Sequence, residues 1–302
     1  MSAAPLVDLA DLFAGDAPTR ARSALDGARL RRATSGQDPV FAAAFSLLNA
    51  YFGPTGELER EPVLRAWAQE PRRRLGPYIV QYSMILAEDM SGSPAGARDT
   101  YAILDLENRV CVVYLAHVFV SPPHRRTGLS SLLRAAPLTL ARQLLAEHDA
   151  ADSALLLAVE QEPVHPTDRD SHVRVASYGR AGYRVIEPRA LPYCQPDFRD
   201  LDALGEPARP LPLLALARWV GHEDQTHLPR RLAAAFVEHL YAVFGTHCRA
   251  ADLAAPRAHA LAALAAWPGS EIPLRPLPST PDEAPAMTEI GRDAVLALFP
   301  CP

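Results

Sequence analysis

The chain of 302 residues contains no lysine, and all 30 of its basic side chains are arginines, so it carries no side-chain amine of its own. Cysteine is also scarce. The four cysteines include no C-x-x-C pair, and the ten histidines show no ligand spacing that converges with them. The sequence therefore predicts neither a disulfide framework nor a metal site. The four are Cys111, Cys194, Cys248 and Cys301.

Long apolar runs and an excess of basic charge are absent as well. No run of about eighteen apolar residues could span a bilayer, and residues 1–16 have no positively charged region ahead of an apolar one. The net charge of −5 and the pI near 6.1 give no basic footprint for nucleic acid. The run Arg72-Arg73-Arg74 is interpreted as a solvated face. We expect a cytoplasmic protein with neither a membrane nor a nucleic-acid partner.

The most informative stretch of the chain runs from Tyr114 to Leu133. Residues Val110–Val120 are rich in β-branched and aromatic side chains, which favours a buried strand, and Pro122-Pro123 must end it. A helix with leucines at helical spacing follows from Leu129. Because a helix N-terminus offers free N–H groups and a positive dipole end, the junction is suited to holding a phosphate.

Two motifs, one after the other along the chain, resemble those of the GNAT superfamily of acyl-CoA-dependent N-acyltransferases. The first is Val120-Ser121-Pro122 followed by Arg125-x-x-Gly128-x-Ser130, with Ser130 where the family has a second small residue. Taken alone, it also fits an ordinary strand-to-helix turn with basic residues. The second lies after a short apolar run and includes Tyr178, Gly182 and Tyr183, similar to the family's pattern A-x-x-x-Tyr-x-x-x-Gly-Phe. Ser171 stands where the family often has an asparagine.

The resemblance implies an α/β (α+β) fold: a mixed, mostly antiparallel sheet with two splayed parallel strands and flanking helices, plus a C-terminal helical extension. The order of elements agrees with it. We expect a strand at 28–34, helices at 38–52 and 57–69, strands at 78–87, 100–106 and 110–120, the helix from Leu129, and a strand at 154–159.

The character of the chain changes after Ile186. Six prolines in residues 188–212 indicate an extended connection, and Leu213–Val220 is predicted to be the last strand of the sheet. Amphipathic helices are expected at 228–244 and 251–267, followed by proline-rich coil and a short helix at 292–299. We predict an N-terminal arm (1–24, around Leu6, Leu9, Leu12 and Phe13), an acyltransferase-like domain (25–220) and an extension (221–302). The extension covers a domain edge, forms a homodimer interface or caps the acceptor site.

The cofactor implied by the resemblance is acetyl-CoA, with no metal. Its pyrophosphate is expected on the backbone N–H groups of the helix start, and its pantetheine arm beside the strand end, where the N–H near Val118 is available to an oxyanion. The pantetheine residues are Val118, Phe119 and Val120. The pyrophosphate residues are Arg125, Arg126, Thr127, Gly128, Leu129, Ser130 and Ser131.

For catalysis, the resemblance implies Tyr178 as the general acid, and we choose Glu160 as the proton acceptor, with Glu162 second. A half-buried packing tyrosine and a solvated strand end are the alternatives. His117 is expected on the strand face opposite Val118 and Val120, without a catalytic role. Acidic residues at the expected acceptor mouth would suit a cationic amine: Glu88, Asp89, Glu160, Glu162 and Asp168.

The sequence thus predicts an N-acetyltransferase acting on a primary amine of a small molecule or peptide. The alternative is a non-catalytic acyl-CoA-binding or interaction protein with the same fold.

Overall fold

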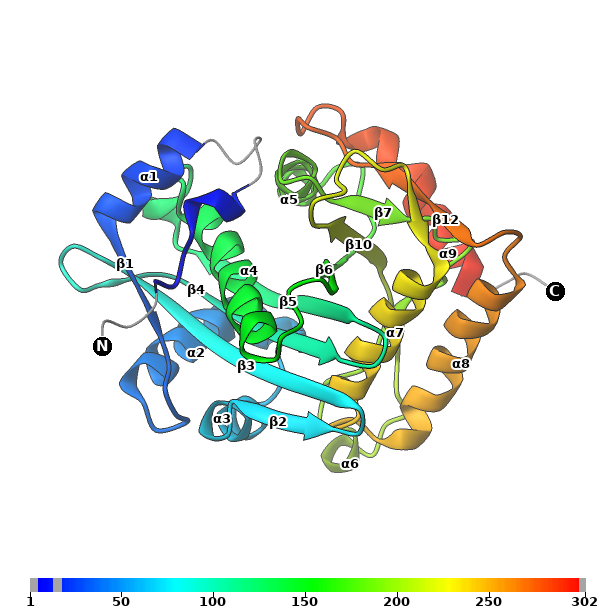
Figure 1. Cartoon of the computed structure of the whole chain (residues 1–302), viewed down its shortest axis with the longest axis horizontal. Helices are drawn as coiled ribbons and strands as arrows, with labels where there is room; N and C mark the ends of the chain where they lie inside the picture. Colours follow the sequence, from blue (N-terminus) through cyan, green and yellow to red (C-terminus); the bar gives the residue numbers. More distant parts are fainter. Residues whose placement is uncertain (1–4, 13–17, 299–302) are drawn as a thin grey trace. The chain divides into compact units, whose positions relative to one another are not determined.

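The computed structural model describes residues 5–12 and 18–298, which group into two compact units, Met1–Ser153 and Ala154–Pro302 (Figure 1). The boundary between the units falls inside the predicted 25–220 domain, and the predicted domain limits stay predictions. Phe13 and Phe299, named in the predicted arm and terminal helix, lie outside the described residues. Across the described residues, no helix has both the length and the apolarity that crossing a membrane requires.

The first unit is an antiparallel sheet with helices on both faces. Its strands lie in the order β1-β3-β4-β5, and β2 pairs with β3. Its elements are η1 (Leu9–Asp11), α1 (Pro18–Gly27), β1 (Ala28–Arg32), α2 (Pro39–Phe52), η3 (Gly53–Thr55), α3 (Glu61–Gln69), β2 (Arg72–Leu75), β3 (Tyr78–Asp89), β4 (Pro94–Asp105), β5 (Val110–Val120), η4 (Pro122–His124) and α4 (Leu129–Glu147).

Capping residues and prolines decide where the first helices begin. The Asp38 carboxylate accepts the Val40 N–H and so caps α2. Helix α3 starts at Glu61, four residues later than predicted, because Pro62 fits only the first turn of a helix. Residues 57–60 therefore belong to the connection between α2 and α3, where Glu59 is buried.

The arginine run is a strand. Residues Arg72–Leu75 form β2 against β3, and the guanidinium of Arg73 lies 4.3 Å from the centre of the Trp67 ring. Only Arg72 and Arg74 face solvent. The interpretation of all three as one solvated face was wrong, because a strand directs alternate side chains to opposite sides.

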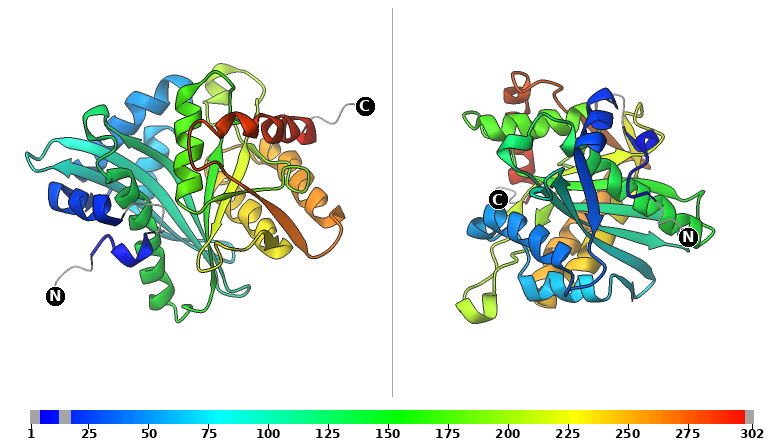
Figure 2. Two further views of the ribbon diagram at one scale, coloured as in Figure 1. Left: turned by 90° about the horizontal axis from the view of Figure 1, so that it is seen from above. Right: turned by 90° about the vertical axis from the view of Figure 1, so that its left-hand side faces the viewer.

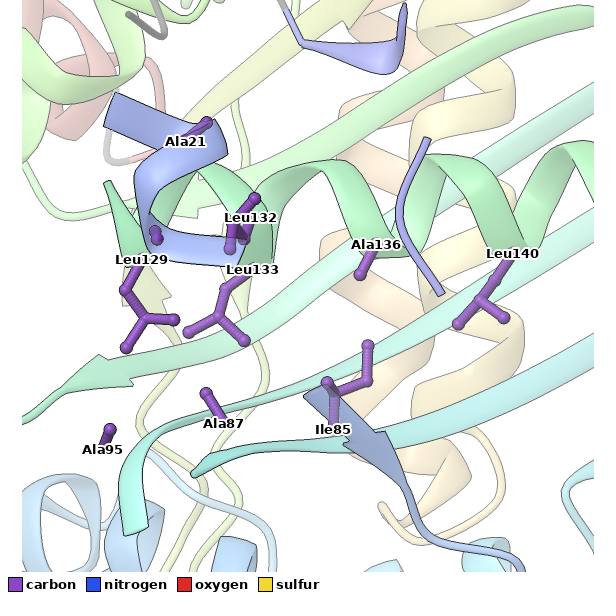
Figure 3. Packing of buried hydrophobic residues seen from close by; sticks show 10 residues of the cluster. Ala21, Ile85, Ala87, Ala95, Leu129, Leu132, Leu133, Ala136 and Leu140 are labelled. Carbon is purple, nitrogen blue, oxygen red and sulfur yellow. The ribbon is translucent and has the colours of Figure 1, made fainter. Parts of the chain in front are cut away.

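Helix α4 contributes to a hydrophobic core of the first unit. Leu129, Leu133, Ala136 and Leu140 of its inner face pack on β3 and β4, and Ala21 of α1 joins the same cluster (Figure 3). Val118 and Val120 pack against this cluster as well. His117 and Phe119 direct their rings to the other face, where they meet Phe52 and Tyr51 of α2. The predicted alternation about His117 is confirmed.

The antiparallel strands of the second unit lie in the order β6-β10-β7-β12-β11. Its elements are β6 (Ala154–Gln161), α5 (Arg169–Arg180), β7 (Arg184–Ile186), β8 (Cys194–Gln195), α6 (Leu201–Leu204), β9 (Leu211–Pro212), β10 (Leu214–Trp219), β11 (His227–Pro229), α7 (Arg230–Phe244), α8 (Ala250–Ala266), β12 (Glu271–Pro276), η5 (Ala284–Met287) and α9 (Thr288–Leu298). Helices α7 and α8 run side by side (Figure 2).

Strand β10 confirms the predicted strand at 213–220, whereas β12 replaces part of the predicted coil. Strand β12 pairs with β7, so the stretch after residue 220 extends the sheet. Pro273 has no N–H to donate, but its carbonyl accepts the Glu187 N–H at 2.9 Å. The predicted fold class, mixed α/β with mostly antiparallel sheet and flanking helices, is confirmed. The splaying of β5 from β6 stays a prediction.

Gly128 supports a stability prediction. Its φ is +100°, and a Cβ at this position would fall on the Arg20 carbonyl and 2.9 Å from the Ala21 nitrogen. Gly92 shares the positive φ, at +85°, but has open space around it. We expect Gly92→Ala to lower the free energy of unfolding by about 1–2 kcal/mol for the strained backbone.

Gly128→Ala should lower the free energy of unfolding by about 1–3 kcal/mol more than Gly92→Ala does, because α1 must move away from the added Cβ. Urea unfolding of both variants measures the difference. Equal losses would mean that α1 does not pack on Gly128.

Candidate functional site

The turn between β5 and α4 is tightly braced by its own side chains. The Ser121 hydroxyl lies 2.8 Å from His124 Nδ1, and the Thr127 hydroxyl donates to the His124 carbonyl at 2.7 Å. Arg126 (φ +65°) and Gly128 (φ +100°) both adopt left-handed backbone conformations. A turn of this kind gathers successive N–H groups into one concavity.

The start of α4 adds donors and charge to this turn. The first N–H that donates within the helix is that of Ser131, to the Gly128 carbonyl at 3.0 Å, so those of Leu129 and Ser130 are first-turn donors. Arg125 and Arg126 are exposed beside them, and Arg125 Nε donates to the Val120 carbonyl at 3.3 Å. The arrangement is suited to an anion such as a pyrophosphate.

Alternate backbone N–H groups of β5 are directed away from β4. The N–H groups of His117 and Ser121 are directed to β4, where they meet the Asp99 carboxylate and the Ala95 carbonyl, both at 2.9 Å. Because N–H groups alternate between the two edges of a strand, those of Val118 and Val120 point away from β4, and that of Phe119 points toward it.

A β-bulge lies just before this segment, and sequence patterns gave no sign of it. Asp99 faces His117 and Tyr101 faces Tyr114, so one residue of β4 lies opposite two residues of β5. Buried side chains bind the backbone groups that the bulge leaves unpaired. The Thr100 hydroxyl donates to the Tyr114 carbonyl at 2.8 Å, and Asp99 Oδ1 accepts the His117 N–H. These bonds fix the direction of the strand that leads to Val118.

His117 is the centre of a buried charged cluster with Asp99 and Glu59. Its Nδ1 lies 3.0 Å from Asp99 Oδ1 and 3.8 Å from Glu59 Oε2, and its Nε2 lies 3.0 Å from the Glu57 carbonyl. A carbonyl only accepts, so Nε2 carries a proton, and Nδ1 needs one to face two carboxylates. Burial by itself lowers the pKa of His117, but the charge and hydrogen bond of Asp99, aided by Glu59, outweigh it and raise the pKa to about 9.

Both ring nitrogens of His117 are therefore occupied within the protein. Its imidazolium connects the bulged strand β5 to the connection between α2 and α3, and it has no free lone pair for a substrate proton. The ligand atoms of Glu59, Asp99 and His117 lie within 4.8 Å of one another, so this set has the composition of a metal site. Residues this far apart in sequence gave no ligand spacing to detect.

The predicted catalytic residues lie in the second unit. Tyr178 is on α5, which begins at the cap formed by Asp168, and its ring meets the Tyr183 ring edge-on at 5.2 Å. Its side chain is nearly buried. The Ser171 hydroxyl donates to the Asp168 carbonyl at 2.8 Å, so it is used inside the first turn of the helix rather than as a free replacement for asparagine.

Glu160 is held by an aromatic hydroxyl. Tyr193 donates to Glu160 Oε1 at 2.7 Å, and the Tyr193 ring packs edge-on against Phe236 and Tyr241 of α7. Glu160 itself is half-buried at the end of β6. The hydrogen bond from Tyr193 fixes the orientation of the Glu160 carboxylate. The alternative of a freely solvated strand end does not describe Glu160.

The other acids of the expected acceptor mouth have local partners. Glu162 is exposed and paired with Arg174 at 2.6 Å, and Glu88 is paired with Arg31 at 3.0 Å. The Ser91 hydroxyl, followed by the Ser93 N–H, lowers the pKa of Asp89 in the β3–β4 turn. The two carboxylates most buried in the first unit are instead Glu59 and Asp99, which the sequence analysis did not select.

Comparison with known proteins finds only distant structural similarity among the matches described below. No protein-family model and no curated protein matches the sequence. Among solved structures, a GCN5-related glucosamine N-acetyltransferase region of a fungal multi-domain GH3 β-N-acetylglucosaminidase matches 52% of this chain, with 19% identity and a TM-score of 0.37, and the match spans 17% of that protein.

Two bacterial proteins match 64% of this chain, each with a TM-score of 0.36. One is assigned as an acyl-CoA N-acyltransferase from Klebsiella pneumoniae subsp. pneumoniae (17% identity, 97% of its length). The other is assigned as an N-acetyltransferase from Lactobacillus plantarum (15% identity, 99% of its length). Sequence identities and TM-scores this low do not indicate the activity of this chain. In its motifs, the chain resembles the GNAT superfamily.

The charge on His117 generates a prediction about pH. Because the folded-state pKa of about 9 lies above the ordinary value of 6.5, its contribution to stability is full below pH 6.5 and is lost as the pH rises through 9. Unfolding in urea at pH 6 and at pH 9.5 should show this loss in the wild type.

His117→Gln should destabilise the protein by about 3–5 kcal/mol at pH 6, because it leaves two buried carboxylates without a cation. Its loss between pH 6 and pH 9.5 should be smaller than that of the wild type. An exposed histidine, His227→Gln, is the control. Parallel pH profiles for wild type and His117→Gln would contradict the ion pair.

Proposed function

We propose that the protein transfers an acetyl group from acetyl-CoA to a primary amine of a small molecule or peptide. The observation that carries the proposal is the β5–α4 junction. There, a turn with two left-handed residues and a helix N-terminus follow directly on a strand whose Val118 and Val120 N–H groups point away from β4. A cytoplasmic location and a homodimer through α7 and α8 stay predictions.

The first unit binds the donor in this proposal. Backbone N–H groups of residues 126–130, with the Arg125 and Arg126 guanidiniums, hold the pyrophosphate of CoA. The Val120 N–H donates to a carbonyl of the pantetheine arm, and the Val118 carbonyl accepts from one of its N–H groups. The Val118 N–H then donates to the thioester oxygen as it becomes an oxyanion, a contribution of about 3–4 kcal/mol for one well-placed donor. The bulge braced by Asp99 and Thr100 holds that donor in position.

Glu160 and Tyr178 carry out the proton transfers in this proposal. Glu160, held by the Tyr193 hydroxyl, accepts a proton from the acceptor's ammonium, directly or through water. The free amine attacks the thioester carbon, the carbon–sulfur bond breaks, and Tyr178 donates its proton to the CoA thiolate. The products are the acetylated amine and CoA. The rival proposal, a non-catalytic CoA-binding protein, shares the donor-binding part only.

Donor binding is tested by thermal stability. A ligand that binds only the folded state adds about 2.7 kcal/mol at 100 times its dissociation constant, so CoA should raise the melting temperature. Pantetheine, which lacks the pyrophosphate, is the matched ligand control and should give a much smaller shift. The double variant Arg125→Ala/Arg126→Ala should need more CoA for the same shift. No shift with millimolar CoA would rule out the cofactor assignment.

Catalysis is tested with two conservative variants. Tyr178→Phe and Glu160→Gln should each lower the turnover number by about 10²- to 10⁴-fold, because each removes one proton-transfer group. CoA affinity, measured by calorimetric titration, should hardly change. Tyr183→Phe, which removes a hydroxyl from the neighbouring ring, is the control and should retain turnover.

Acetyl transfer is followed by thiol release over a broad panel of amines. Full turnover in Tyr178→Phe would remove this residue from the mechanism. CoA binding without transfer to any amine would favour the non-catalytic alternative.

A further inference from the structure

Three aromatic rings, one exposed and two half-buried, lie together beside the proposed donor strand. Tyr51 and Phe52 end helix α2, and Phe119 lies between Val118 and Val120 on β5. The Tyr51 ring lies 4.9 Å from Phe52 and 5.3 Å from Phe119, centre to centre. Among the Phe, Trp and Tyr side chains of the described residues, only Tyr51 is exposed, at 42%, and Phe52 and Phe119 are half-buried. We call these three residues the aromatic wall.

We propose that the aromatic wall binds the body of the acceptor, and that the acceptor is a primary amine carried on an aromatic or other flat apolar group. This inference rests on the proposed acetyl transfer and names its substrate class. Three adjoining rings offer flat apolar area with a single hydroxyl, that of Tyr51. Such a surface stacks with a planar ring at about 0.5–1.5 kcal/mol per ring pair, beyond the burial of area.

Phe119 connects the aromatic wall to the strand that is proposed to hold the thioester. Its side chain leaves β5 between the two residues whose N–H groups are assigned to the donor. It also leaves on the face opposite the Val118 and Val120 side chains, which pack toward α4. A ring stacked on Phe119 therefore lies next to the backbone at Val118. An amine attached to that ring by a short chain is directed along the strand toward the thioester.

The charge behind the wall suits an ammonium group. The Phe52 ring lies 5.1 Å from the His117 ring, and His117 contacts the carboxylates of Asp99 and Glu59. Two carboxylates and one imidazolium leave one negative charge among these three groups. Its field reaches the surrounding side chains: after burial, the charges of Asp99 and Glu59 are the causes that raise the pKa of Tyr82. The faces of the wall's rings attract a cation as well.

The test compares primary amines whose bodies differ. 2-Phenylethylamine, n-butylamine and glucosamine are each offered to the wild type with acetyl-CoA, and kcat/KM is measured by thiol release. We expect 2-phenylethylamine to exceed both other amines by about tenfold or more, the effect of stacking on two rings. Equal values for 2-phenylethylamine and glucosamine would overturn the proposal.

Variants of the wall provide the second arm. Tyr51→Ser and Phe119→Leu should each lower the ratio of kcat/KM for 2-phenylethylamine over n-butylamine by about fivefold, since each removes one stacking ring. Met90→Ser, at a 70% exposed side chain on the β3–β4 turn, should keep the wild-type ratio. CoA titration of each variant checks that the donor site is intact. An unchanged ratio in both wall variants would overturn the proposal.

A binding measurement separates failure of this inference from failure of the proposed function. Saturation-transfer NMR detects 2-phenylethylamine on the protein with CoA present and needs no turnover. A signal that Tyr51→Ser weakens, without acetyl transfer to any amine, supports the wall and contradicts the chemistry. Transfer to n-butylamine without a signal from 2-phenylethylamine supports the chemistry and overturns the wall.

Discussion

The buried contact between His117 and Asp99 is the interaction on which the first unit's site depends. An imidazolium in a dry interior needs carboxylates close by, and Asp99 and Glu59 provide them from a strand and from the connection after α2. The same Asp99 oxygen also accepts the His117 backbone N–H. One carboxylate therefore stabilises both the imidazolium and the backbone of the β-bulge. The direction of β5 beyond the bulge, and with it the Val118 N–H, follows from that contact.

Beyond the bulge, the backbone itself forms the functional surface. Left-handed residues in the turn, the first turn of α4 and the outward N–H groups of β5 are main-chain features, and they tolerate many side chains. Gly128 is the exception, because its missing Cβ admits the backbone of α1 beside the turn. The glycine of the motif therefore serves packing within this chain as well as the conformation of the turn.

In the second unit, the candidate proton acceptor depends on residues far from it in sequence. Tyr193 comes from the proline-rich connection after β7, and the rings that hold it come from α7. Strand β12 belongs to the same sheet. The stretch after residue 220 thus helps to build the surroundings of Glu160, and a description of it as a separate appendage misses this role.

The sequence by itself determined the elements with strong local signals: β5 with its proline stop, the leucine-rich α4, the glycine turn between them, and the helix α2. Each depends on residues within one turn or one strand, where spacing is visible. Tertiary structure alone decided the bulge, the cluster of Glu59, Asp99 and His117, the support of Glu160 by Tyr193, and the aromatic wall. Their members come from separate strands, helices and connections, and only packing brings them together. A pattern along the chain cannot show that two carboxylates meet one imidazole, because burial and charge act through space.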